Sequence, residues 1–171
     1  MRLDDFVQAQ VYFFIAPGYE EDFAVNCLVQ MRLQGVGVAL IGTTRGEMVG
    51  AQGVCIRPDL SLDHVEKKPL PQLLIIPGGE EGLRGLMIEP RLHRLVHSAL
   101  QVGKKIALGK GAENFLSFKD IVVNARCKRQ IIFQEGTRPD DFIQQLILCL
   151  TANSDPALPV YPDSTQIPQI G

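Results

Sequence analysis

The sequence predicts an α/β fold, in which an open, doubly wound and mostly parallel sheet carries helices on both faces. Two observations predict it. Short apolar runs rich in β-branched residues alternate with segments whose apolar residues recur at helical spacing, and short glycine-containing loops join them. The chain has 171 residues, of which 46% are hydrophobic and 21% charged, a balance typical of one globular domain.

The N-terminal part of the chain predicts a β-α-β unit. Residues 11–16 form a short aromatic and β-branched run, which indicates a buried strand. The next segment carries an apolar stripe typical of an amphipathic helix, formed by Phe23, Ala24, Cys27, Leu28 and Met31. Gly35 is well placed to end this helix, because glycine adopts the left-handed cap conformation without strain. Residues 36–41 then predict a second strand, parallel to the first.

The remaining elements follow the same alternation. Further strands are predicted at residues 54–57, 73–76, 104–108, 121–123 and 130–133. A helix closed by Gly103 is predicted where Leu92, Leu95, Val96, Ala99 and Leu100 share one face. A short helical stretch reaches Leu116, and a last helix begins at Pro139 and runs to Leu150. We assign residues 1–152 to a single domain and residues 153–171 to a proline-containing tail.

Composition argues against several kinds of partner. The formal net charge is −2, so the chain has no basic excess for a phosphate backbone and we expect no nucleic-acid partner. The longest apolar runs are far shorter than the roughly 20 residues of a membrane span, and the N-terminal residues lack the features of a signal peptide. We therefore expect a cytoplasmic protein with no membrane partner.

The four cysteines are far apart in the sequence and form no CxxC pair, which predicts a reduced, cytosolic state without a zinc site. We interpret Cys27, Cys55 and Cys149 as small apolar residues of the core. Cys127 lies in a basic run and is expected to be an exposed thiol.

Three predicted loops lie at the carboxyl ends of strands, where open α/β sheets bind their ligands: residues 17–22, 77–81 and 109–111. The glycine-rich loops match neither the dinucleotide fingerprint nor the phosphate loop. His93 and His97 have a spacing that can bind metal, but the adjacent glutamate of the zinc-protease motif is missing. We therefore predict no metal site and no cofactor.

Three segments occur in a familiar order along the chain: Gly18-Tyr19-Glu20-Glu21, Leu74-Ile75-Ile76-Pro77-Gly78-Gly79 and Gly103-Lys104-Lys105-Ile106-Ala107. With this order, residues 10–150 resemble the PfpI-like superfamily, which includes intracellular proteases, protein deglycases and, more distantly, class I glutamine amidotransferase domains. The resemblance implies a flavodoxin-like sheet. It also implies a cysteine on a sharp strand-to-helix turn, a glutamate on the first helix, a histidine from a later loop in several members, and an oxyanion-binding amide from the Pro-Gly-Gly loop.

Carried over by the resemblance, these functional positions hold other residues in this chain. The position of the cysteine falls on Lys110, or on Gly109 if the register shifts by one residue, and that of the glutamate falls on Phe23. No room is left after Phe118 for the histidine-bearing loop, and His64, His93 and His97 lie elsewhere. We therefore do not expect cysteine hydrolase or deglycase chemistry.

Lys110 admits three interpretations. It points to solvent or pairs with Glu20, Glu21 or Glu80; it binds a small anion together with free helical amides; or it is an amine, made reactive by desolvation, that forms Schiff bases with carbonyl compounds. The candidate ligand-binding residues are Glu20, Gly78, Gly79, Lys110 and Gly111.

These observations favour a catalytically degenerate protein that binds a small anionic or carbonyl metabolite, or a protein partner, near Lys110. The alternatives are a lysine-dependent enzyme acting on small carbonyl compounds and a stress-protective, chaperone-like protein. The resemblance also implies a homodimer or a larger homo-oligomer.

Overall fold

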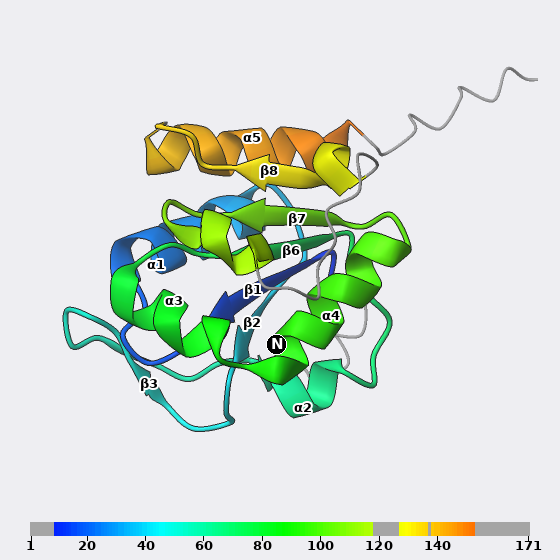
Figure 1. Cartoon of the computed structure of the whole chain (residues 1–171). Coiled ribbons are helices and arrows are strands. Elements are labelled where there is room, and N and C mark those ends of the chain that lie inside the picture. The colour runs from blue at the N-terminus through cyan, green and yellow to red at the C-terminus, as the bar shows by residue number, and fades with distance from the viewer. Residues whose placement is uncertain (1–8, 118–126, 137, 153–171) are drawn as a thin grey trace, which may run out of the picture.

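The computed structural model describes residues 9–117, 127–136 and 138–152. Its centre is a six-stranded sheet with the order β5-β2-β1-β6-β7-β8, in which every pairing is parallel (Figure 1). The strands are β1 (Val11–Ile15), β2 (Val38–Gly42), β5 (Leu60–Ser61), β6 (Leu73–Ile76), β7 (Lys105–Leu108) and β8 (Ile131–Phe133). A separate antiparallel hairpin pairs β3 (Met48–Val49) with β4 (Cys55–Ile56).

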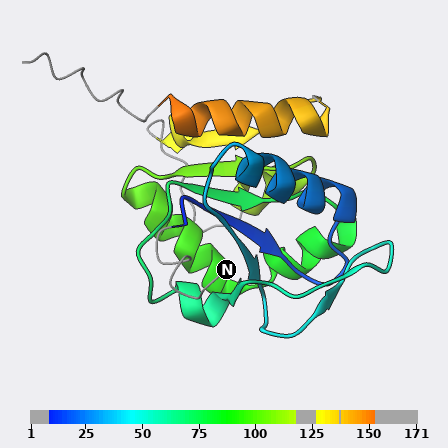
Figure 2. The ribbon, with the colours of Figure 1, turned by 180° about the vertical axis from the view of Figure 1, so that it is seen from behind.

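Helices cover both faces of the sheet, as the alternation in the sequence predicts. One layer holds α1 (Glu21–Leu33) and α5 (Pro139–Thr151), which lie side by side in Figure 2 and share a Gln144–Gln30 hydrogen bond of 2.7 Å. The other layer holds α2 (Leu62–Val65), α3 (Glu80–Met87), α4 (Pro90–Gln101) and the 3-10 helix η2 (Ala112–Ser117). A second 3-10 helix, η3 (Cys127–Gln130), precedes β8.

Strand periodicity divides the core into two layers. Tyr12 and Phe14 of β1 pack in the layer of α2, α3 and α4, whereas Phe13 and Ile15 pack under α1 and α5. Successive side chains of a strand point to opposite faces, so a strand apolar at every position must be covered twice. The five apolar residues predicted for α1 and the five predicted for α4 are all buried, which confirms both stripes.

The helix α3 was not predicted from the sequence, since the loop after β6 was expected to extend to Glu81 and instead ends at Gly79. Its two glycines, Gly82 and Gly85, lower helix propensity and hide its periodicity. Close packing requires them. A Cβ atom on Gly82 would lie 2.8 Å from Tyr19 Cα, and one on Gly85 would lie 2.9 Å from Ala16 Cβ.

The cysteine predictions are only partly confirmed. Cys27 is fully buried, and burial raises the pKa of its thiol to about 12. Cys55 is exposed on β4, so its assignment to the core is wrong, because this short strand belongs to the hairpin and not to the central sheet. Cys149 is only half-buried on α5. The strand expected at residues 121–123 and the tail at 153–171 lie outside the described residues, and nothing is described of the Cys127 side chain.

In the part of the chain that the structure describes, no helix has the length and apolar character needed to cross a membrane.

Candidate functional site

The strand order reverses between β1 and β6, which is where open α/β sheets place their ligands. The loops that follow β6 and β7 touch there through their backbones. A Cβ atom on Gly109 would lie 2.2 Å from Gly78 N, and one on Gly78 would lie 2.3 Å from Lys110 O. Glycine is therefore required at both positions for the two loops to approach this closely.

A groove of about 540 Å³ opens beside this contact. We call it the switch-point groove, and it is lined by Glu20, Gly79, Glu80, Leu83, Arg84, Met87, Lys110 and Gly111. The structure thus brings together four residues predicted as ligand-binding, Glu20, Gly79, Lys110 and Gly111. Gly78 lies behind them against the Lys110 backbone.

The α3 residues of the groove were missed as ligand-binding candidates. Leu83 and Met87 are spaced i, i+4, as are Glu80 and Arg84, so a helical reading of this segment would have placed each pair on one face. The sequence does not predict this helix, because Gly82 and Gly85 lower its helix propensity.

The turn at the predicted cysteine position lacks the strain of a nucleophile elbow. Among the described residues only glycines have positive φ, and in this turn that residue is Gly111, at +86°. Lys110 is exposed, and its backbone N–H donates to Gln134 Oε1 at 3.2 Å. Gly109 has no space for a side chain. The turn therefore does not project a buried nucleophile into the groove.

Phe23 belongs to the core and does not line the groove. Its side chain is 6% exposed, and its ring centroid lies 5.8 Å from that of Phe13 and 6.2 Å from that of Phe142 on α5. The carboxylate that reaches the groove is that of Glu20. Its side chain lies over Gly79, where an added Cβ atom would be 2.7 Å from Glu20 Cγ.

The neighbouring Glu21 has a structural partner instead. Its Oε1 accepts hydrogen bonds from Gln52 N at 2.6 Å and Val54 N at 3.3 Å, while its Oε2 is buried without a partner. Burial raises the pKa of Glu21, but backbone N–H groups outweigh this effect and hold the pKa below its usual value. The Tyr19 hydroxyl donates to Val54 O at 2.8 Å. These contacts tie the hairpin to the start of α1.

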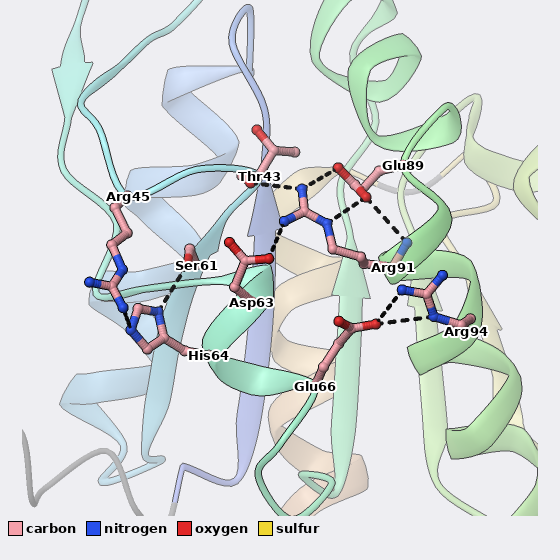
Figure 3. Close-up of polar contacts among 9 residues, drawn as sticks. All are labelled: Thr43, Arg45, Ser61, Asp63, His64, Glu66, Glu89, Arg91 and Arg94. Atoms are coloured by element: carbon pink, nitrogen blue, oxygen red, sulfur yellow. Dashed lines mark hydrogen bonds and ion pairs between the residues drawn. The ribbon is translucent and has the colours of Figure 1, made fainter.

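A second polar cluster lies where β2 ends, between α2 and α4 (Figure 3). Arg91 contacts Glu89 through two nitrogens at 2.7 and 2.5 Å, Asp63 at 2.6 Å and Thr43 O at 3.1 Å. Glu89 also caps α4 by accepting from Arg91 N at 3.2 Å. The hydrogen bond from Arg91 lowers the pKa of Glu89. We call this the Arg91 cluster; its charges satisfy one another, which indicates a structural role.

The same view holds a serine–histidine pair that the sequence did not suggest. Ser61 Oγ lies 2.9 Å from His64 Nδ1, the contact of a nucleophile with its base, but Ser61 is fully buried. The other nitrogen of His64 faces the guanidinium of Arg45 and not a carboxylate (Figure 3). A buried hydroxyl and a cationic third group do not make a hydrolytic site.

The two histidines of α4 have separate partners. His93 donates from Nε2 to Met87 O at 2.6 Å, and its ring stacks on that of Phe115 with 4.5 Å between the ring centroids. His97 Nε2 lies 2.9 Å from Gln101 Nε2. No group of three or more metal-ligating side chains occurs within the described ranges.

Comparison with known proteins identifies relatives of this chain. The family model described as DJ-1/PfpI matches residues 9–129. An oxidized Toxoplasma gondii DJ-1 has a TM-score of 0.71 and 20% identity, covering 82% of this chain and 89% of that one. Drosophila melanogaster DJ-1beta has a TM-score of 0.70 and 18% identity, covering 84% and 90%. A mutant DJ-1 superfamily protein from Salmonella typhimurium has a TM-score of 0.70 and 19% identity, covering 85% and 92%.

These structural likenesses show the flavodoxin-like fold. No curated protein sequence matches the chain.

Phe23→Glu is expected to destabilise the protein by about 4 kcal/mol, because it places an unpaired carboxylate among the rings of Phe13 and Phe142. Phe23→Leu is the matched control and should cost about 1.5 kcal/mol, the size of a cavity left by a smaller apolar side chain. Urea unfolding followed by circular dichroism measures both. Equal losses for the two variants would contradict the placement of Phe23 in the core.

Arg91→Met is expected to lower the free energy of unfolding by about 2 kcal/mol, because Glu89 and Thr43 O lose their partner. Arg84→Met provides the comparison on another helix. Its pair with Glu80 is exposed, at 70% and 90% for the two side chains, so its loss should cost less than about 0.5 kcal/mol. Thermal unfolding distinguishes the two, and a loss at Arg84 as large as at Arg91 would refute the structural role of the Arg91 cluster.

Proposed function

The chain belongs to the DJ-1/PfpI family, and we propose that it is a catalytically degenerate member that works by binding. In this proposal the switch-point groove holds a small anionic or carbonyl metabolite beside Lys110. The observation that carries it is the backbone contact between Gly78 and Gly109, because it leaves a ligand-sized groove without space for a side chain at position 109.

The positions of the cysteines support binding over thiol chemistry. Cys27 is buried on the core-facing side of α1, Cys55 lies on the hairpin, and Cys149 lines a different groove on α5. Of the cysteines whose side chains the structure describes, none lines the switch-point groove. A family nucleophile would have to stand in that groove to use its surrounding backbone amides.

The lysine-dependent enzyme receives less support from the same groove. Schiff-base lysines are made reactive by desolvation or by a neighbouring cation, and Lys110 is exposed. The chaperone-like alternative rests on the family alone. We retain the cytoplasm as the proposed location, because the sequence has cysteines without CxxC pairs and an apolar content ordinary for a globular domain.

Lys110→Gln is expected to weaken pyruvate binding about tenfold, because Lys110 is a basic residue of the groove, whereas the other, Arg84, is already paired with Glu80. Pyruvate is the probe because it is both an anion and a carbonyl compound. Its binding is measured by titration of backbone amide signals, with those of Gly79 and Gly111 expected to shift. Lys104→Gln, at the opposite end of β7, is the control and should leave the affinity unchanged.

Borohydride separates binding from catalysis in the same experiment. Treatment of the pyruvate complex should leave the mass of the protein unchanged. A stable adduct on Lys110 would favour the lysine-dependent enzyme, and an affinity that is the same in Lys110→Gln would refute the binding site.

We also propose that the protein forms a homo-oligomer through the outward face of α1. Proteins of the DJ-1/PfpI family are often oligomers. On α1, Val25, Val29 and Leu33 follow one another at four-residue spacing and are 43%, 49% and 79% exposed. This helix is apolar on its outward face as well as toward the core, a pattern typical of a helix covered on both sides.

Val29→Glu is expected to convert the oligomer to a species of 18.9 kDa, because it places a charge at the middle of this apolar face. Val102→Glu is the control, because Val102 is 61% exposed beyond α4, away from that face. Light scattering coupled to size-exclusion chromatography gives both masses. A monomeric wild type, or an unchanged mass in Val29→Glu, would refute this interface.

A further inference from the structure

The charges that line the switch-point groove balance one another. Glu20 and Glu80 are acidic, whereas Arg84 and Lys110 are basic. Arg84 and Glu80 form an ion pair of 3.0 Å on α3. Within the described ranges Glu20 and Lys110 take part in no ion pair, so the groove offers a ligand one carboxylate and one ammonium.

Glu20 and Lys110 lie against two consecutive glycines, Gly78 and Gly79, which we call the floor of the groove. The Glu20 side chain lies over Gly79, and the Lys110 backbone lies over Gly78, each within 3 Å of where a Cβ atom would stand. Gly78 and Gly79 are consecutive, and consecutive Cα atoms are about 3.8 Å apart. Glu20 and Lys110 both line one groove of about 540 Å³, which is the size of a site for a single small molecule.

The groove also has apolar lining residues on α3. Leu83 and Met87 are one helical turn apart on α3 and both line the groove. Met87 is half-buried, and its flexible thioether adapts to aliphatic groups of different shape. The groove therefore combines two opposite charges with an apolar wall.

We infer that the switch-point groove takes a zwitterionic ligand, a free α-amino acid with an apolar side chain. Its carboxylate contacts Lys110, its ammonium contacts Glu20, and its side chain packs on Leu83 and Met87. This inference rests on the proposed function and narrows its ligand class.

A simple anion fits the groove less well, because Glu20 would repel it while Lys110 attracts it. An ammonium on the same molecule converts that repulsion into a second attraction. The charge arrangement thus selects an amino acid over a keto acid of the same carbon skeleton.

The test compares three probes on the full chain by isothermal titration calorimetry: L-leucine, N-acetyl-L-leucine and L-leucinamide. The acetyl compound lacks the ammonium, and the amide lacks the carboxylate. Leucine is expected to bind at least about tenfold more tightly than either, since each loses one charged contact.

Two variants assign the contacts. Glu20→Gln should weaken leucine binding about tenfold without weakening that of N-acetyl-leucine, and Lys110→Gln should weaken leucine about tenfold without weakening that of leucinamide. Glu47→Gln and Lys104→Gln are the controls: Glu47 is exposed, and neither residue lines the groove, so leucine should bind both as it binds the wild type. Circular dichroism melting verifies that all variants are folded.

The outcomes separate this inference from the proposed function. If N-acetyl-leucine or pyruvate binds as tightly as leucine, and Glu20→Gln has no effect, the zwitterionic ligand is refuted while a metabolite site at Lys110 stands. If no probe binds at millimolar concentration, both are refuted.

Discussion

The contact between the backbones of Gly78 and Gly109 is the constraint on which the rest of the site depends. It brings the ends of β6 and β7 closer than any side chain would allow, with 2.2 Å between Gly78 N and the place of a Cβ atom at position 109. Such an approach leaves no space for a side chain at position 109, and the groove beside it is lined in part by residues of α3. The charged residues beside this contact come from other parts of the groove: Glu20, Lys110, and the paired Glu80 and Arg84 of α3.

Phe23 packs in the core layer of α1 and α5. Its ring stacks on Phe142, so the first helix and the last are joined by aromatic packing where the family resemblance implies a functional carboxylate. The position contributes to folding and contributes nothing to the groove. A carboxylate at this position would be buried among aromatic rings, where an unpaired charge is costly.

Most of the fold follows from the sequence because its signals are periodic. The stripes of α1 and α4 and the apolar strands β1, β6 and β7 predict a sheet with helices on both faces, while the strand order comes from the structure. The sequence does not predict α3, because Gly82 and Gly85 lower its helix propensity. Glycine is needed at both positions for close packing against Tyr19 and Ala16, which are distant in sequence. Cys55 was misplaced for a similar reason, since a two-residue strand in a hairpin carries no periodicity. For the same reason, the sequence predicts the loops that line the groove but not its α3 side chains.

The sequence predicts Glu20 as a ligand-binding residue, but it does not indicate the structural role of Glu21, which is adjacent and chemically alike. Backbone N–H groups of the hairpin hold Glu21, whereas Glu20 turns toward Gly79 and the groove. Tyr19 donates to the same hairpin. Because the three residues are consecutive, the hairpin contacts of Tyr19 and Glu21 hold the backbone on both sides of Glu20. The position of the groove's free carboxylate is thus set by a hairpin that lies outside the sheet.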